Sequence, residues 1–105
     1  MMRRNEVWWA ELPKPAGPRP VVILTRNAIL ESIDSFVVAL VTRTIRNLPT
    51  EVRLGRKEGL PRPCVVNLDN LLTVPKRRLT RLMGALESAK TDELNRALKL
   101  SLEIS

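Results

Sequence analysis

Histidine is absent from the 105 residues of this chain, and Cys64 is its only cysteine. The chain therefore has no imidazole for acid–base catalysis, and too few soft ligands for a typical zinc site. A lone cysteine forms no intramolecular disulfide, which indicates a reducing compartment such as the cytoplasm. Because no histidine can activate it, Cys64 is interpreted as a core residue of an apolar strand. We expect no metal and no cofactor.

Long apolar runs and aromatic residues are also scarce. No run approaches the roughly 20 apolar residues that span a membrane, and residues 1–4 are not followed by the apolar segment of a signal peptide. Phe36, Trp8 and Trp9 are the only aromatic residues, so the core must rest on Leu, Val and Ile. A small core of this kind is often stabilised by dimerisation, and the length predicts one domain, residues 1–105.

Acidic residues are outnumbered by basic ones. It carries 18 Lys and Arg residues against 11 Asp and Glu residues, a net charge of +7, and the basic residues lie in both halves. Such an excess indicates a polyanionic partner, either a nucleic acid or an acidic protein. The alternative is a basic surface that serves only solubility.

Two continuous apolar runs, residues 20–24 and 36–41, dominate the sequence, and Arg19 directly precedes the first. Both are rich in β-branched residues and lack polar alternation, so we predict strands that are buried on both faces. Pro20 suits the start of a strand, where its missing N–H costs no ladder hydrogen bond. Arg19 therefore begins one core strand, and Thr42 follows the other.

Shorter strand patterns surround these two runs. Strands are predicted at residues 6–12, 50–54, 64–69, 71–74 and 81–86. Prolines and glycines predict a loop at 13–18, which overhangs the Arg19 end of its strand, and a long hairpin loop at 55–63. Helical spacing from Ser88 or Thr91 onward predicts a terminal helix. The result is a small, curved, mainly antiparallel sheet with a C-terminal helix.

Antiparallel pairing of the two apolar strands would make Arg19 and Thr42 neighbours. A site of this kind suffices to cleave RNA, because the 2′-hydroxyl is an internal nucleophile. A guanidinium neutralises charge on the phosphate, and a Thr hydroxyl donates or accepts nearby. Asp69, Glu6 or water must then take the proton. The alternative for Arg19 is a plain surface charge at a strand end.

A series of short motifs runs through nearly the whole chain. In order they are RxEVWW at 4–9, RPVVIL at 19–24 with Asn27, a β-run ending in Val41 and Thr42, LPTEV at 48–52, CVVNLDN at 64–70 leading to Thr73, KRRL at 76–79, Gly84 and the C-terminal helix. No single motif is diagnostic, but the ordered set resembles the MazF/PemK family of toxin endoribonucleases from type II toxin–antitoxin systems.

The resemblance implies a mainly β (α+β) fold: a small SH3-like, PemK-type antiparallel barrel with a C-terminal helix, working as a homodimer. It implies a metal-independent endoribonuclease that cuts single-stranded RNA at short motifs, leaves a cyclic phosphate and is inhibited by a cognate antitoxin. The family's catalytic arginine and threonine fall on Arg19 and Thr42. An aspartate that one branch uses for catalysis or RNA contact falls on Asp69.

Further residues are predicted to contact RNA. They are Lys14, Arg26, Arg43, Arg46, Asn70 and Thr73. Trp8 and Trp9 point to opposite faces of a strand, so we expect one in the core and the other against a base or in the dimer interface. Residues 76–78 are either a basic surface run or a site for RNA or the acidic tail of an antitoxin.

The chain departs from the family pattern at several points. Its first loop is shorter than that of the family and lacks the histidine that one branch has there. Asn67 stands where that branch has an arginine, and Asn70 stands where the family has a glutamine. A shorter loop over the site bears on substrate preference and rate. Two other functions stay open: a toxin on the same barrel that poisons DNA gyrase, and a non-catalytic nucleic-acid-binding module.

Overall fold

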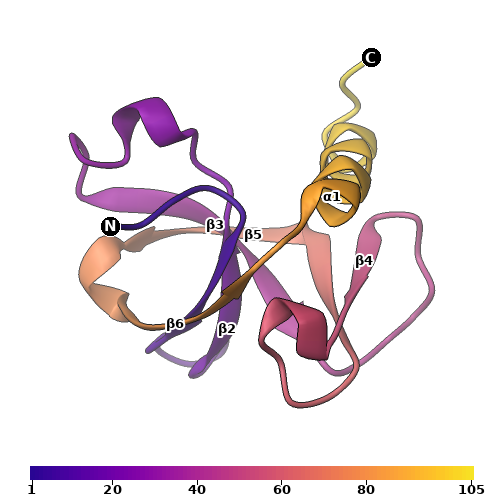
Figure 1. Ribbon diagram of the computed structural model, residues 1–105, viewed down its shortest axis with the longest axis horizontal. Helices are drawn as coiled ribbons and strands as arrows, with labels where there is room; N and C mark the ends of the chain where they lie inside the picture. The colour runs from indigo at the N-terminus through magenta and orange to yellow at the C-terminus, as the bar shows by residue number, and fades with distance from the viewer.

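The computed structural model describes all 105 residues as one antiparallel six-stranded sheet with a C-terminal helix, as Figure 1 shows. The strands are β1 (Glu6–Ala10), β2 (Arg19–Ile23), β3 (Ser35–Thr42), β4 (Glu51–Leu54), β5 (Cys64–Pro75) and β6 (Leu79–Ala85), followed by α1 (Ser88–Ser101). Three 3₁₀ turns lie in the connections: η1 (Asn27–Ile29), η2 (Arg56–Glu58) and η3 (Lys76–Arg78). The predicted fold class, mainly β with a C-terminal helix, is confirmed.

The sheet curls but does not close into a barrel. Its strand order is β4-β5-β3-β2-β1-β6, and the edge strands β4 and β6 do not pair with each other. The turn η2, which follows β4, lies against β6 instead, on the lower side of Figure 1. The expected barrel is therefore an open, curved sheet whose two edges meet through a turn.

Strands β2 and β3 are buried on both faces over residues 21–23 and 38–41, as their apolar sequences predict, whereas Val37 of β3 is 38% exposed. In β2, Val22 belongs to one core cluster, whereas Val21 and Ile23 belong to another on the opposite face. The helix α1 covers the first cluster through Leu94 and Ala97. With both faces covered, the middle of the sheet is a rigid support for residues at the strand ends.

The outer strands differ in detail from the predicted ranges. The predicted strands 64–69 and 71–74 form one strand, β5, and the bend between them is a break in register: Ala39 pairs with Leu71, but Leu40 pairs with Asn67. Strand β6 begins at Leu79, two residues before the predicted start. The helix α1 begins at the earlier of its two predicted positions. No helix of the fold is long and apolar enough to cross a membrane.

Candidate active site

Strands β2 and β3 pair antiparallel, the arrangement that makes Arg19 and Thr42 neighbours. Val21 pairs with Leu40, and continuing this register two residues toward the start of β2 sets Arg19 opposite Thr42. The Arg19 side chain reaches across to β3, where Nη1 donates to the carbonyl oxygen of Val41 at 3.5 Å. Both Arg19 and Thr42 line the same hollow. A single chain thus brings the two residues together.

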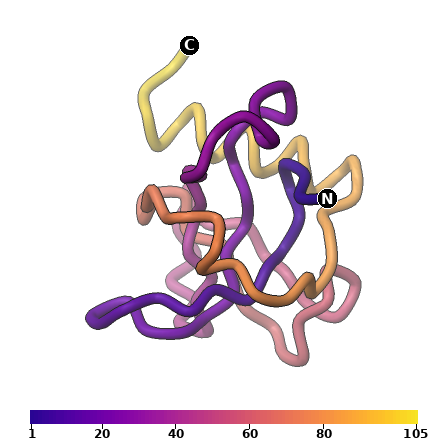
Figure 2. The backbone as a smooth tube through the Cα atoms, turned by 90° about the vertical axis from the view of Figure 1, so that its left-hand side faces the viewer, coloured from indigo at the N-terminus to yellow at the C-terminus, as the bar shows by residue number.

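The loop between β1 and β2 holds the Arg19 guanidinium in place. Figure 2 shows this loop projecting from the body of the molecule. Nε and Nη2 of Arg19 both donate to the carbonyl oxygen of Ala16, at 3.0 and 2.7 Å. With the bond to Val41, these contacts use three of the five N–H groups of the guanidinium and leave one free on each terminal nitrogen. Two free N–H groups can bind the oxygens of a phosphate.

The Thr42 hydroxyl is also oriented by the backbone. Its Oγ1 accepts a hydrogen bond from the backbone N–H of Thr44 at 3.1 Å. Because the oxygen is used as an acceptor, the hydroxyl hydrogen is left to donate to another group. The half-buried Thr42 side chain therefore offers a donor in the hollow that Arg19 lines.

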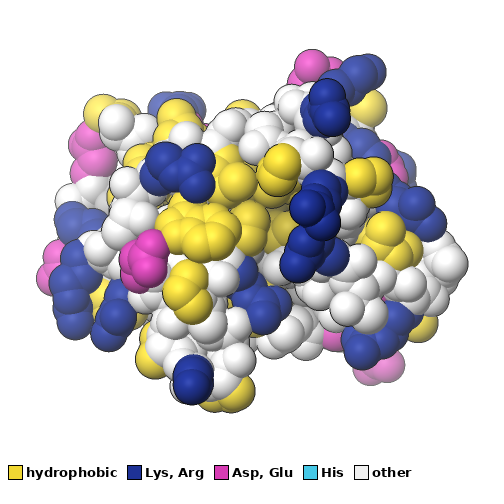
Figure 3. All heavy atoms as spheres, turned by 90° about the horizontal axis from the view of Figure 1, so that it is seen from below, with side chains coloured by type: hydrophobic (Ala, Val, Ile, Leu, Met, Phe, Trp, Pro, Cys, Tyr) yellow, Lys and Arg dark blue, Asp and Glu magenta, His cyan; other side chains and the backbone are white.

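Arginine is the only charged residue type on the wall of this hollow, which has a volume of about 1190 Å³. We call it the arginine groove; it is lined by Trp9, Pro18, Arg19, Pro20, Val41, Thr42, Arg43, Thr44, Arg56, Gly59, Leu60, Pro61, Arg62, Cys64, Arg81 and Met83. Figure 3 views the molecule from below relative to Figure 1 and shows hydrophobic side chains (yellow) with Lys and Arg side chains (dark blue) around them. A cationic groove without a carboxylate favours a polyanionic ligand.

A second hollow meets the arginine groove at Arg19, which lines both. Lys14 comes from the loop between β1 and β2, and Asn70 and Thr73 come from β5. Arg78 of η3 completes the polar part of its wall. Three of the predicted RNA contacts thus line the second hollow together with Arg19, and a fourth, Arg43, lines the arginine groove.

The two carboxylates considered for proton transfer lie outside both hollows. Asp69 sits where β5 breaks register, and its Oδ2 accepts a hydrogen bond from the hydroxyl of Thr50 at 2.6 Å. Glu6 accepts hydrogen bonds from the indole N–H of Trp8 and the backbone N–H of Arg3. Within one chain, the structure does not bring either carboxylate to Arg19 and Thr42.

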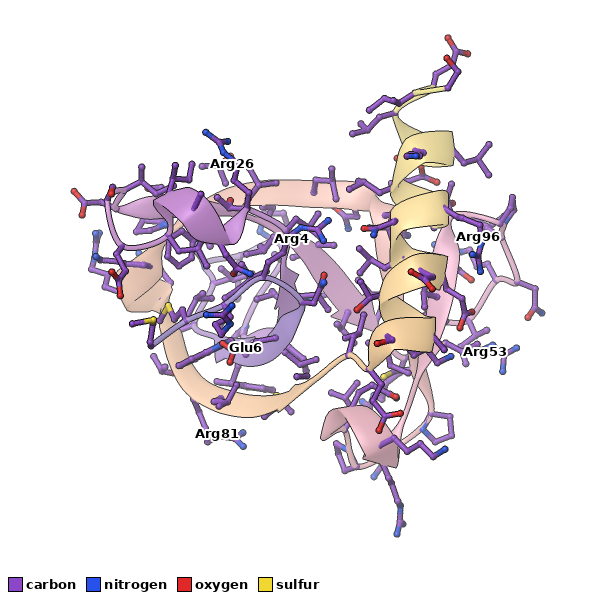
Figure 4. All side chains as sticks on the ribbon, turned by 45° about the horizontal axis from the view of Figure 1, so that its top comes forward. Arg4, Glu6, Arg26, Arg53, Arg81 and Arg96 are labelled. Carbon is purple, nitrogen blue, oxygen red and sulfur yellow. The ribbon has the colours of Figure 1, made fainter.

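Arg26 and Arg46 also lie outside both hollows, with exposed side chains. Arg26 precedes η1, and Figure 4 shows it on the opposite side of the molecule from Arg81. The backbone N–H of Arg46 donates to the Glu51 carboxylate, which fixes the turn before β4 rather than the site. A role for these two arginines in RNA binding stays a prediction.

Arg56, Arg62 and Arg81 line the arginine groove, although the sequence did not single them out. The first two belong to the predicted loop 55–63, which folds back against β6. The sequence feature that could have indicated this contact is the pair Gly59 and Gly84. Gly59 has a φ of +89°, and Gly84 lies on β6 opposite it. Such glycines permit a close approach of two backbones.

Cys64 lies on the groove wall as a buried thiol, as its apolar surroundings in the sequence suggest. Burial raises the pKa of the Cys64 thiol to about 11, and the charge of nearby Glu58 adds to this effect. The thiol is therefore neutral near pH 7, which disfavours a nucleophilic role. No three His, Cys, Asp or Glu side chains gather to hold a metal ion.

Comparison with known sequences relates this chain to one family over almost its whole length. A family model described as "PemK-like, MazF-like toxin of type II toxin-antitoxin system" matches residues 3–102. The "Probable endoribonuclease MazF2" of Mycobacterium tuberculosis is 40% identical over 101 residues, which cover 95% of this chain and 97% of that protein. "Endoribonuclease EndoA" of Bacillus subtilis is 29% identical over 112 residues, covering 99% and 97%.

Solved structures lead to the same family. The "Mycobacterium tuberculosis toxin MazF-mt6" superposes with a TM-score of 0.89 at 33% identity, covering 95% of this chain and 98% of that one. An "Endoribonuclease in complex with its cognate antitoxin from Mycobacterial species" also gives 0.89, at 28% identity, covering 100% and 98%. With the family match spanning strands, groove and helix alike, the chain belongs to the PemK-like, MazF-like toxins of type II toxin–antitoxin systems.

Proposed function

We propose that this chain is a toxin that cuts single-stranded RNA in the arginine groove without a metal ion. The observation that carries the proposal is that Arg19, with two free guanidinium N–H groups, and Thr42, with a free hydroxyl hydrogen, line the same groove. Five arginines and no carboxylate line the surrounding wall, which suits a phosphodiester chain. Relatives named as endoribonucleases support the cleavage of RNA.

The proposed reaction uses a nucleophile that the substrate itself carries. The 2′-oxygen of one nucleotide forms a bond to the neighbouring phosphorus, and the bond from phosphorus to the 5′-oxygen of the next nucleotide breaks. The 2′-hydroxyl loses a proton, and the leaving 5′-oxygen gains one. The products are a 2′,3′-cyclic phosphate and a 5′-hydroxyl. The protein has only to stabilise charge and guide two protons.

Arg19 and Thr42 take the two electrostatic roles. The two free N–H groups of Arg19 bind phosphate oxygens, and these hydrogen bonds strengthen as negative charge builds on the phosphorane. Thr42 donates its hydroxyl hydrogen to a phosphate oxygen and so orients the phosphate for attack. Because Ala16 and Thr44 hold these groups beforehand, little reorganisation accompanies the reaction.

Within a single chain, we assign both proton transfers, from the 2′-hydroxyl and to the 5′-oxygen, to water in the arginine groove. No carboxylate lines the arginine groove, and the neutral thiol of Cys64 is a weak acid there. Arginine stays protonated at the pH of the cell and is a poor base. A role for Asp69 in proton transfer or RNA contact remains the alternative suggested by the sequence.

We further propose that the chain works as a homodimer in the cytoplasm and that a cognate antitoxin inhibits it. A structural relative was solved "in complex with its cognate antitoxin", which supports the second point. An acidic antitoxin segment would find the same cationic wall that RNA finds. The free thiol of Cys64 fits a reducing compartment.

The test is to incubate the purified protein with single-stranded RNA in EDTA and to identify the fragment ends. We expect discrete fragments with cyclic phosphate and 5′-hydroxyl ends from the parent chain and none from Arg19→Ala. Arg96→Ala is the matched control, because Arg96 is an exposed arginine on α1, away from the groove in Figure 4. RNA binding without cleavage would support a non-catalytic module, and gyrase-dependent DNA breakage a gyrase poison; either result contradicts the proposal.

A further inference from the structure

The indole of Trp9 lies on the wall of the arginine groove rather than in the core. Trp8, its neighbour on β1, packs against one of the two core clusters, whereas Trp9 belongs to neither. Trp9 is half-buried and lines the groove together with Arg19 and Thr42. Of the two tryptophans, which a strand directs to opposite faces, Trp9 is therefore the one that is available to a ligand.

Hydrogen bonds and strand pairing fix the position of this ring. The indole N–H of Trp9 donates to Oε2 of Glu11 at 2.6 Å, and the backbone N–H of Glu11 donates to the carbonyl oxygen of Arg78 at 2.8 Å. On the two neighbouring strands, Trp9 pairs with Pro20 and with Arg81. A ring held in this way loses little conformational entropy when a ligand stacks on it.

The side chain of Arg81 lies over the ring of Trp9. Its guanidinium carbon is 5.8 Å from the centre of the ring, within the range of a cation–π contact. Both side chains line the arginine groove. A planar guanidinium is weakly hydrated and stacks on π systems, as an indole does. The two groups together form an exposed stacking surface beside the site of Arg19.

We propose that Trp9 and Arg81 form a stacking subsite for one unpaired nucleobase, next to the phosphate that Arg19 holds. The inference rests on the proposed function. Trp9 pairs with Pro20, the residue after Arg19, and the side chains of Trp9 and Arg19 both line the arginine groove. The base of a nucleotide beside the scissile phosphate can therefore reach the ring of Trp9.

The subsite selects by ring area rather than by base-edge hydrogen bonds. The indole N–H is already bound to Glu11, so Trp9 offers a ligand only its ring face. Every base has a π face, and a larger one gains more by stacking. The subsite therefore favours purines over pyrimidines and rejects bases held inside a duplex.

A binding experiment tests the subsite without any cleavage. In Trp8→Phe, Trp9 is the only tryptophan, so intrinsic fluorescence reports on its ring alone. The probe is single-stranded DNA, which lacks the 2′-hydroxyl and stays uncut, with a dye whose anisotropy reports binding. We expect the fluorescence of Trp9 to be quenched as the oligonucleotide binds. Binding without quenching would overturn the inference.

A cleavage experiment then locates the base. An RNA series carries one abasic nucleotide at each position around the cut. We expect Trp9→Leu to raise KM roughly 10-fold or more, with kcat changed less than about 3-fold, and Trp9→Phe to lie between it and the parent. One abasic position flanking the cut should raise KM for the parent but not for Trp9→Leu. An abasic effect that is equal in both proteins would overturn the inference.

The two proposals fail in different ways. If RNA is never cut but Trp9 is quenched by bound oligonucleotide, the proposed reaction is wrong and the stacking subsite stands. If RNA is cut and Trp9→Leu matches the parent, the reaction stands and the subsite is wrong. Arg81→Lys keeps the charge but removes the planar group, so we expect a KM between those of the parent and Trp9→Leu.

Discussion

The backbones of Gly59 and Gly84 lie in direct contact. A Cβ on Gly59 would be 2.0 Å from the carbonyl oxygen of Met83, and a Cβ on Gly84 would be 2.3 Å from that of Glu58. Neither glycine therefore has room for a side chain. This contact joins the turn after β4 to β6, and so it assembles the wall of the arginine groove from two distant parts of the chain.

Gly84→Ala is expected to push the turn η2 away from β6. Because the clash is with backbone atoms, relief requires a backbone shift, and we expect the free energy of unfolding to fall by about 1–3 kcal/mol. Cleavage should weaken as well, since the groove wall moves. Gly55→Ala is the control, because a Cβ there meets nothing within 4 Å. Equal urea midpoints for the two variants would contradict this account.

Asp69→Ala tests whether the Asp69 carboxylate, predicted from the sequence, takes part in proton transfer. Removing it leaves the buried hydroxyl of Thr50 without its acceptor, so the free energy of unfolding should fall by about 1–2 kcal/mol. The single-turnover cleavage rate should stay within about 3-fold of the parent, because Asp69 lies outside the arginine groove. A loss of about 100-fold in rate by a folded variant would show that Asp69 takes part in the reaction.

The arginines of the loop 55–63 are expected to act through charge. Each phosphate contact to a single strand contributes about 0.7 to the slope of log affinity against log salt. Arg62→Gln should therefore reduce this slope by about 0.7, measured with uncleavable single-stranded DNA. Arg96→Gln, which removes the same charge outside the groove, should leave the slope unchanged. Equal slopes for the parent and Arg62→Gln would remove Arg62 from the interface.

Cys64 is expected to lower stability at alkaline pH. The pKa of the Cys64 thiol is about 11 in the folded chain, above the ordinary value of 9.0. Between pH 9 and pH 11, the thiol has therefore lost its proton in the unfolded chain but retains it in the folded chain. Stability is therefore unaffected below about pH 9 and falls as pH rises toward 11. From about pH 8 to about pH 10, Cys64→Val should gain about 1 kcal/mol relative to the parent. Parallel stability curves for the two proteins would contradict the raised pKa.

The centre of the fold could be predicted because its sequence signals are local. Residues 20–24 and 36–41 are continuous apolar runs rich in β-branched residues, a pattern typical of strands that are buried on both faces. Once they pair antiparallel, the register sets Arg19 opposite Thr42. The proximity of these two residues therefore followed from two strand predictions and one assumption about pairing.

The rest of the groove depends on contacts between distant segments. Apart from Gly59, nothing in the composition of residues 55–63 indicates that they fold back onto β6 and bring Arg56 and Arg62 into the groove that Arg19 lines. The open edge of the sheet also depends on a contact between distant segments. The turn η2 lies against β6, where β4 would pair in a closed barrel. The predicted division between residues 64–69 and 71–74 indicated an irregularity near Asp69, but not the shift in pairing between β3 and β5 that sets its position.

The central claim is that Arg19 and Thr42 act together on one phosphate. Single-turnover cleavage rates of the parent, Arg19→Ala, Thr42→Val and the double variant test it most directly, with thermal unfolding as the check on folding. We predict that each single change slows cleavage by about 100-fold or more, and that the double change costs less than the product of the two. A folded Arg19→Ala or Thr42→Val protein that cuts RNA at the parent's rate would contradict the claim.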